Sequence, residues 1–298
     1  MQTIGCDRHI YAFSTDLAPA ASVPCGSRVR FDAQDALGGQ VRAATDVLSG
    51  LDFDRVNPAT GPLAVEDVHA GDTLVVTVES IEVDGRGVTV AGPGLGVLPD
   101  LLERHVTRIL PVTSDAVCFD EIRLPARPMI GVIGVAPATG AYPTGTAHRH
   151  GGNMDTKEIG IGARLVLPVF QDGAMLAMGD VHAVMGDGEV CVSGCEVSAR
   201  ITVTVDCIAG RQRDWPIVVT DDAVHVIVSL PTIDAALEEA TRQSVAILSD
   251  ACGVPTEDAY MLSSLAVNLG ISQLVDPNKT AKATIPRSIL ARPIDEWL

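Results

Sequence analysis

The sequence predicts a mainly β fold with an α+β C-terminal part and a core of the β-sandwich or barrel kind. Three observations predict it. Between about residues 28 and 229, short apolar and β-branched runs are separated by Gly, Pro and Asp. One of these runs alternates between apolar and polar residues, as a half-buried strand does. After residue 231 the apolar residues recur at helical spacing instead.

The strand signal is clearest in the run 197–206. Here Val197, Ala199, Ile201, Val203 and Val205 fall on one face, and polar residues fall on the other. Because the runs follow one another without helical spacing between them, they favour packed sheets over alternating βαβ units. The expected strand segments are 73–83, 130–136, 163–170, 191–206 and 216–229.

Two helices are expected near the C-terminus. Thr232 is a good N-cap, helical spacing follows from Ile233 to Ile247, and Gly253 ends the pattern. A second helix should begin at residues 255–256 and end at Gly270, before a strand at 271–275. Its apolar stripe would consist of Leu262, Leu265, Ala266 and Leu269.

A change of character near residues 208–214 suggests two units. We expect a β-rich core domain over residues 1–210, which carries the site, and a smaller α+β unit over residues 211–298. The length of 298 residues is ample for a sizeable buried core.

Charge and composition narrow the range of partners. The formal net charge is −17, which repels phosphate backbones and anionic membranes and suits a small neutral or cationic ligand. No apolar run reaches the ~18–20 residues of a membrane span, and residues 1–20 contain no apolar signal core. The seven cysteines form no CxxC pair, so we expect a reducing, cytoplasmic location without a zinc ribbon or disulfide scaffold.

The first candidate for chemistry is the stretch 148–155. His150, Asn153 and Asp155 surround the pair Gly151 and Gly152. Glycines let a backbone approach a ligand closely or adopt positive φ, and such a loop between strands is typical of a binding site. The alternative is a Gly-Gly turn whose Asn153 and Asp155 satisfy their own backbone.

The second candidate spans residues 179–196. On one strand, Asp180 and His182 would point to the same face, because side chains alternate. An imidazole and a carboxylate so placed can share a divalent cation, or the carboxylate can fix the imidazole tautomer. Residues 186–188 read Gly-Asp-Gly, a hairpin signal that favours a turn role for Asp187.

Further acids are candidates for the same cleft. Glu189 follows the Gly-Asp-Gly turn, and Glu196 stands beside Cys195 and Val197 in an apolar strand. A carboxylate there costs free energy unless it is paired, although a solvent-facing strand glutamate is the alternative. Asp35 lies in the loop 32–40, which either joins the cleft or is a simple acidic loop.

Four segments together resemble the acetamidase/formamidase family. The most specific is GGNMDTKEIGIGARLVLPVF followed by GDVHAVMGDGEV. The resemblance runs in family order over about residues 28–285. One departure is Met185, which stands where a glutamine is expected before Gly-Asp-Gly-Glu. The four segments are 57–83, 128–137, 150–190 and 261–276.

This resemblance implies hydrolysis of short aliphatic amides, such as formamide or acetamide, to ammonia and a carboxylate. It implies a mostly β fold with an α+β portion and assembly into homo-oligomers, a dimer or larger. Divalent cations, zinc or calcium among them, are also implied. Met185 alters the expected polarity of the pocket, so the substrate need not be formamide.

Amide hydrolysis needs a nucleophile, stabilisation of the oxyanion and a proton for the leaving amine. The sequence has no GxSxG elbow and no HExxH motif. We therefore hypothesise a divalent metal ion, which lowers the pKa of water and polarises a carbonyl. The mixture of imidazole and carboxylate favours zinc, with calcium as the alternative. The candidate ligands are His150, Asp155, Asp180 and His182.

The remaining candidates divide the other tasks. Glu196 or Glu189 would take a proton from water and pass it to nitrogen. Asn153 would hydrogen-bond a small neutral amide substrate, and the backbone of Gly151 and Gly152 would stabilise the oxyanion.

Two alternatives stay open at the level of sequence. One is a metal-free amidase that uses a carboxylate pair, such as Asp35 with Glu196. The other is a β-sandwich protein that binds small metabolites without catalysis.

Overall fold

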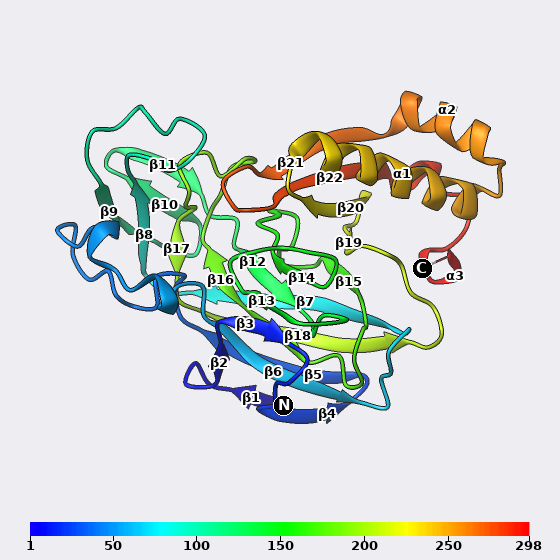
Figure 1. Cartoon of the computed structure of the whole chain (residues 1–298), viewed down its shortest axis with the longest axis horizontal. Coiled ribbons are helices and arrows are strands. Elements are labelled where there is room, and N and C mark those ends of the chain that lie inside the picture. Colours follow the sequence, from blue (N-terminus) through cyan, green and yellow to red (C-terminus); the bar gives the residue numbers. More distant parts are fainter. Residues whose placement is uncertain (298) are drawn as a thin grey trace.

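The structure is a computed structural model that describes residues 1–297. Within these residues it contains two nine-stranded sheets and two short two-stranded ones, with the α-helices near the C-terminus (Figure 1). The mainly β class with an α+β C-terminal part is therefore confirmed.

The first large sheet contains strands from the N-terminal, middle and C-terminal parts of the chain. Its central strands pair antiparallel, for example Val203 of one strand with Val78 and Val29 of its two neighbours. In order across the sheet, the strands are β1 (Gln2–Ile4), β5 (Ser27–Ala33), β18 (Ala199–Ile208), β7 (Thr73–Val83), β15 (Arg164–Pro168), β19 (Ile217–Val219), β20 (Ala223–Leu230), β22 (Lys279–Pro286) and β21 (Asn268–Gln273).

The second large sheet carries the polar clusters. Its main path is β14 (Gly151–Asn153), β12 (Met129–Gly134), β16 (Leu176–His182), β17 (Glu196–Val197), β8 (Arg86–Ala91) and β9 (Val106–Pro111). A branch pairs β6 (Ala59–Glu66) with β16, β2 (His9–Ile10) and β4 (Ala21–Pro24). The small sheets join β10 (Ala116–Phe119) to β11 (Ile122–Pro125), and β3 (Ala12–Ser14) to β13 (Ala141–Pro143).

The two large sheets share one hydrophobic core. Phe31 of β5 and Leu74 of β7 meet Ile133 of β12 and Leu176 of β16 in this core, and all four are fully buried. A core built from the inner faces of two sheets defines a β-sandwich. Neither sheet closes on itself, so the arrangement is layered and not a barrel.

The alternating strand behaves as predicted, with local differences. Val197, Ile201 and Val205 are fully buried. The expected run 191–206 is strand only from Glu196, because residues 191–195 form a loop. The expected run 216–229 is a hairpin, since the turn at 220–222 separates β19 from β20.

The first long helix, α1 (Ile233–Cys252), has the predicted ends. The hydroxyl of Thr232 accepts a hydrogen bond from the N–H of Ala235. Gly253 ends the helix in the left-handed conformation, at φ 68°. The apolar face of α1 packs on β20 and β22 in a second hydrophobic core.

The second helix, α2 (Thr256–Ala266), is shorter than predicted. Gly270 does not end it but lies inside β21, because pairing of β21 with β22 takes over from residue 268. The predicted apolar stripe is also partly wrong: Leu265 and Leu269 are 84% and 51% exposed. Among the other helices, α3 (Ile294–Trp297) follows, and one-turn 3-10 helices cover 48–50, 53–55 and 287–289.

The expected domain boundary lies within the first sheet. Strand β15 pairs with β19, and β19 with β20, so strands from both sides of residue 210 hydrogen-bond in series. The division into units 1–210 and 211–298 stays a prediction. Among residues 1–297, no helix has the length and apolar character that crossing a membrane requires.

The N-cap of α1 provides a test of the local argument. Thr232→Ala should lower the free energy of unfolding by about 1 kcal/mol, because the N–H of Ala235 loses its acceptor. Thr232→Ser keeps the hydroxyl and should stay close to the parent protein. Urea denaturation measures both variants, and equal stability of the two would contradict this role.

Candidate active site

The centre of the second sheet holds a buried histidine among carboxylates. His182 lies at the end of β16, directly opposite Glu196 of β17. Its Nε2 atom is 3.2 Å from Asp180 Oδ1, 3.1 Å from Glu196 Oε2 and 3.8 Å from Glu189 Oε1. All four residues are buried. The structure thus brings four of the sequence candidates to one point.

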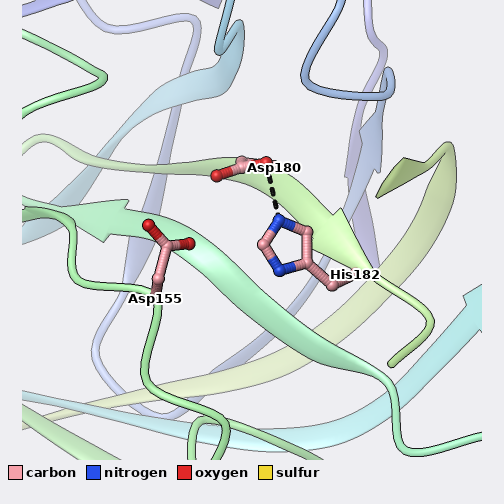
Figure 2. A group of neighbouring side chains, drawn as sticks. All are labelled: Asp155, Asp180 and His182. Carbon is pink, nitrogen blue, oxygen red and sulfur yellow. Dashed lines mark hydrogen bonds and ion pairs between the residues drawn. The ribbon is translucent and has the colours of Figure 1, made fainter. Parts of the chain in front are cut away.

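Asp155 joins them from the segment that follows β14. Figure 2 shows its carboxylate directed toward the space shared with Asp180 and His182. Two sets of potential ligand atoms have all their members within 4.8 Å of one another. One set is Asp155, Asp180 and His182, and the other is His182, Glu189 and Glu196. Both sets share the imidazole and can hold a metal ion.

Two glycines make this close approach feasible. A Cβ on Gly131 of β12 would lie 2.5 Å from Asp155 Oδ1 and 2.6 Å from Asp180 Oδ2. A Cβ on Gly194 would lie 2.6 Å from Nδ1 of His182. Any other residue at these positions would push the charged groups apart.

The backbone of the site is strained at its acids. Asp155, Asp180 and Glu189 have φ values of 41°, 51° and 47°, in the left-handed region that costs free energy for a residue with a Cβ. Such conformations persist where the surrounding structure imposes them, and they cluster at functional sites. Three of the acidic residues at this site therefore have a strained backbone conformation.

Burial and mutual repulsion shift the pKa values of the acidic side chains around His182. Burial raises the pKa of Asp155 and of Glu189 well above the ordinary range, and it raises the pKa of Glu196 to about 8. Burial alone would lower the pKa of His182, but Glu196 and its neighbours outweigh burial and raise it well above the usual value. The protein alone does not supply enough positive charge here, so a bound cation would favour the ionised acids.

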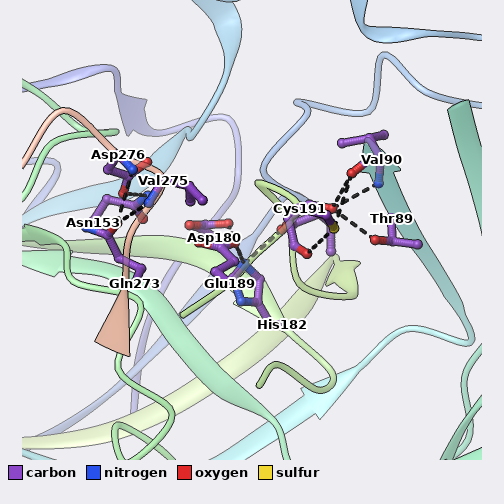
Figure 3. Close-up of polar contacts among 12 residues, drawn as sticks. Thr89, Val90, Asn153, Asp180, His182, Glu189, Cys191, Gln273, Val275 and Asp276 are labelled. Atoms are coloured by element: carbon purple, nitrogen blue, oxygen red, sulfur yellow. Dashed lines mark hydrogen bonds and ion pairs between the residues drawn. The ribbon is translucent and has the colours of Figure 1, made fainter. Parts of the chain in front are cut away.

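Asp276 is a member of the site that the sequence reasoning missed. It follows β21 in the C-terminal part, and its Oδ2 accepts a hydrogen bond of 2.7 Å from Asn153 Nδ2 (Figure 3). Burial raises its pKa to about 7, and the hydrogen bond from Asn153 acts in the opposite direction. The available signal was an acid at the end of the expected strand 271–275.

A network around Lys282 supports the segments that carry the acids. Lys282 of β22 is 5% exposed, and its Nζ lies 2.7 Å from Glu158 Oε1 and 2.8 Å from Asp187 Oδ1. Glu158 follows Asp155 by three residues, and Asp187 precedes Glu189 by two. One buried ammonium group therefore ties both segments to the C-terminal strands, and Asp187 pairs with both Lys282 and Lys157.

A cavity of about 390 Å³ adjoins this centre. Its acidic part includes Asp180, Glu189, Glu196 and Asp276, with Asn153 beside them. The rest of its lining is mainly apolar and comes from the segment 36–57, the chain after β8 and the loop after Glu189. This apolar lining includes Leu37, Leu48, Phe53, Val56, Leu95 and Val192.

Three other predicted residues contact groups outside the carboxylate cluster. His150 packs against the rings of Phe13, Tyr142 and His148, and burial lowers its pKa to about 3. It is outside both ligand sets found among residues 1–297. Gly151 donates its N–H to the carbonyl of His148, and a Cβ on Gly152 would lie 2.5 Å from the carbonyl of Thr146. Their roles as ligand and oxyanion donors stay predictions.

Asp35 is buried, and its carboxylate accepts hydrogen bonds from the backbone. Its Oδ1 accepts hydrogen bonds from the N–H groups of Leu37 and Gly39, at 3.0 and 3.2 Å. This capped turn shapes the start of the segment 36–57. Among residues 1–297, Asp35 belongs to neither of the two ligand sets, one of which contains Glu196.

The fold and the site together define a β-sandwich protein with a buried histidine–carboxylate centre beside a cavity for a small molecule. The sequence matches the acetamidase/formamidase family over residues 8–144 and 138–292. The chain belongs to this family, as its resemblance predicted.

Solved structures of relatives agree in fold over nearly the whole chain. An acetamidase from Bacillus halodurans is 39% identical with a TM-score of 0.94, and the match covers 95% of this chain and 97% of that one. A predicted acetamidase/formamidase from the thermophile Thermoanaerobacter tengcongensis is 41% identical with a TM-score of 0.95, with 98% and 99% covered.

Curated relatives are more distant. The acetamidase of Mycolicibacterium smegmatis is 26% identical over 270 residues, which cover 67% of this chain and 66% of that protein. The chain spans between 61% and 66% of the length of the curated relatives that it matches.

Gly131 allows a direct test of the site geometry. Gly131→Ala should destabilise the protein by about 1–3 kcal/mol, because the new methyl group overlaps two carboxylates. Gly85→Ala is the control, since its Cβ would meet only the carbonyl of Val112, at 3.7 Å. Thermal unfolding of both variants measures the difference, and a Gly131→Ala protein as stable as the control would contradict the packing described.

Proposed function

We propose that the chain is an amidase that hydrolyses short-chain amides to ammonia and a carboxylate. Family membership supports the reaction class. The observation that carries the proposal is the set of buried acids around His182, beside a cavity of small-molecule size. In this reaction the C–N bond breaks, water oxygen joins the carbonyl carbon, and a proton from water goes to the leaving nitrogen.

The donor set fits a divalent cation. Both carboxylate oxygens of Asp155 are buried without a hydrogen-bond partner among residues 1–297, and buried polar groups normally have one. The ion would be held by His182 with Asp155 and Asp180, which leaves Glu196 free to act as a base. When bound, such an ion lowers the pKa of water and polarises a carbonyl. The imidazole among the donors favours zinc over calcium.

The chain's own groups account for proton movement and positioning. Glu196, held opposite His182, accepts the proton of the attacking water at a carboxylate oxygen and delivers it to the leaving nitrogen. Asn153 keeps its Oδ1 without a partner in the described chain, so this oxygen can accept the N–H of the amide. Asp276 fixes the Asn153 amide group through Nδ2.

The two alternatives are less well supported. A metal-free pair of Asp35 with Glu196 would need an Asp35 carboxylate directed at the cavity, whereas its Oδ1 accepts two backbone N–H groups. A binding protein without catalysis would have little use for strained acids at the cavity. Tight binding of an amide without release of ammonia would favour the binding protein.

We also propose a cytoplasmic location and assembly into homo-oligomers. The seven cysteines are free thiols in the structure, which suits a reducing compartment. Exposed Tyr260, Met261, Leu265 and Leu269 lie on and beside α2. An identical subunit that covers this apolar surface would remove it from water.

Removal of metal tests the first part of the mechanism. Protein treated with a chelator should lose ammonia release from acetamide and regain it with Zn²⁺, and Zn²⁺ should raise its Tm because it binds the folded state. Asp155→Asn should reduce the rise in Tm. Full turnover by protein whose metal content is negligible by mass spectrometry would overturn the metal proposal.

Glu196→Gln tests the proposed base. It should lower kcat by about 10²–10⁴-fold, which is the usual contribution of a general base. Glu82→Gln is a matched control, because its side chain is 64% exposed and pairs with Arg200 at the surface. If kcat of Glu196→Gln stays within about tenfold of the parent, worth ~1.4 kcal/mol, Glu196 is structural.

A further inference from the structure

The cavity is larger than the smallest amides require. Its volume of about 390 Å³ lies in the range of pockets that enclose whole organic ligands, and it equals on the order of a dozen water molecules. Formamide has no carbon beyond its carbonyl, and acetamide has a single methyl group. Neither molecule could lie at the acidic centre and also reach most of the apolar lining.

The apolar lining is an organised part of the structure. Leu37, Leu48 and Val90 are buried in a hydrophobic cluster of their own, with Leu95 and Val192 packed against it. The segment 36–57 that supplies much of it is closed on itself, since the N–H of residue 57 donates to the carbonyl of residue 36 at 2.7 Å. The cavity therefore keeps an apolar face without a ligand.

This segment is also braced across its middle. The amide of Gln40 donates to the carbonyl of Asp52 at 3.1 Å, and the N–H of Asp52 donates back to Gln40 Oε1 at 2.9 Å. The carboxylate of Asp46 accepts the N–H groups of Arg42 and Ala43, at 2.8 and 2.9 Å. A braced wall loses little conformational entropy when a ligand binds.

Phe53 is the most conspicuous residue of this wall. It borders the cavity from the one-turn helix 53–55, yet its side chain is 59% exposed. An aromatic ring left in water beside a cavity gains free energy when an apolar group covers it. The substrate would supply that group.

The charge of the lining restricts the substrate further. Four of its residues are acidic, and no lysine or arginine of residues 1–297 is among them. A carboxylate on the substrate would be repelled, and a charged end against Leu37, Phe53 and Leu95 would lose its hydration. The apolar side of the cavity therefore suits an uncharged group.

We propose that the preferred substrate is an amide whose acyl group is an uncharged apolar chain or ring of about four to eight carbon atoms. This inference rests on the proposed amidase function. The carboxamide lies at the acidic centre, and the acyl group lies against Phe53 and Leu95. The products are ammonia and the corresponding apolar carboxylate, by the same exchange of a C–N bond for a C–O bond.

A chain-length series tests this substrate class. Ammonia release gives kcat/KM for formamide, acetamide, butanamide, hexanamide and 6-aminohexanamide with the protein as isolated. Each methylene from acetamide to hexanamide should raise kcat/KM about fourfold, so hexanamide, with four more methylenes, should exceed acetamide by about 250-fold. The terminal ammonium group of 6-aminohexanamide should abolish most of this gain.

Variants connect the effect to the cavity wall. Phe53→Ala should lower the ratio of kcat/KM for hexanamide to that for acetamide by about tenfold, and Phe53→Leu should keep most of it. Leu95→Ala tests the wall from another segment and should also lower the ratio. Ile122→Ala is the control, because Ile122 is 60% exposed on β11 and does not line the cavity, and it should leave the ratio unchanged.

The outcomes separate the two proposals. If kcat/KM is flat or falls from acetamide to hexanamide, or if neither wall variant changes the ratio, the substrate class is wrong and the amidase function stands. If no amide of the series releases ammonia, both proposals are overturned.

Discussion

The structure depends on one electrostatic constraint, which is the gathering of several carboxylates around a single imidazole inside a protein. Isolated buried charges are very costly, so such groups are neutralised, paired or bound to a cation. His182 alone cannot balance Asp180, Glu189 and Glu196. The pKa values raised by burial and the polar atoms without partners are two consequences of this imbalance, and a divalent ion would resolve both.

The strands and glycines of the fold hold the acids and the imidazole in place. The acids lie on or beside the strands of a sandwich with a buried core, and Asp155, Asp180 and Glu189 have left-handed backbone conformations. Gly131 and Gly194 leave the space that the carboxylates and the imidazole occupy. Sites on such elements keep their geometry better than sites on free loops, which agrees with a site prepared before the ligand arrives.

The sequence predicts the features that depend on neighbouring residues. Alternation predicts the buried face of β18, and the caps predict both ends of α1, because each signal acts within a few residues. The sequence also indicates the clusters at residues 150–155 and 180–196, because imidazole, carboxamide and carboxylate side chains stand close together beside glycines there. The end of α2 was wrong, since pairing with β22 at Gly270 is a tertiary contact that overrides a local stop signal.

The difference between local signals and tertiary contacts also explains why the sequence did not predict Asp276 as a site residue. Asp276 meets Asn153 across 123 positions of sequence, and no local pattern reports such a contact. Lys282 reaches Glu158 and Asp187 in the same way. The division at residue 210 stays a prediction, and residues beyond it supply one acid of the cavity and the ammonium group that anchors the segments of Glu158 and Asp187. Separation of the two parts would leave buried carboxylates without their partners, so stability and site geometry are coupled through the first sheet.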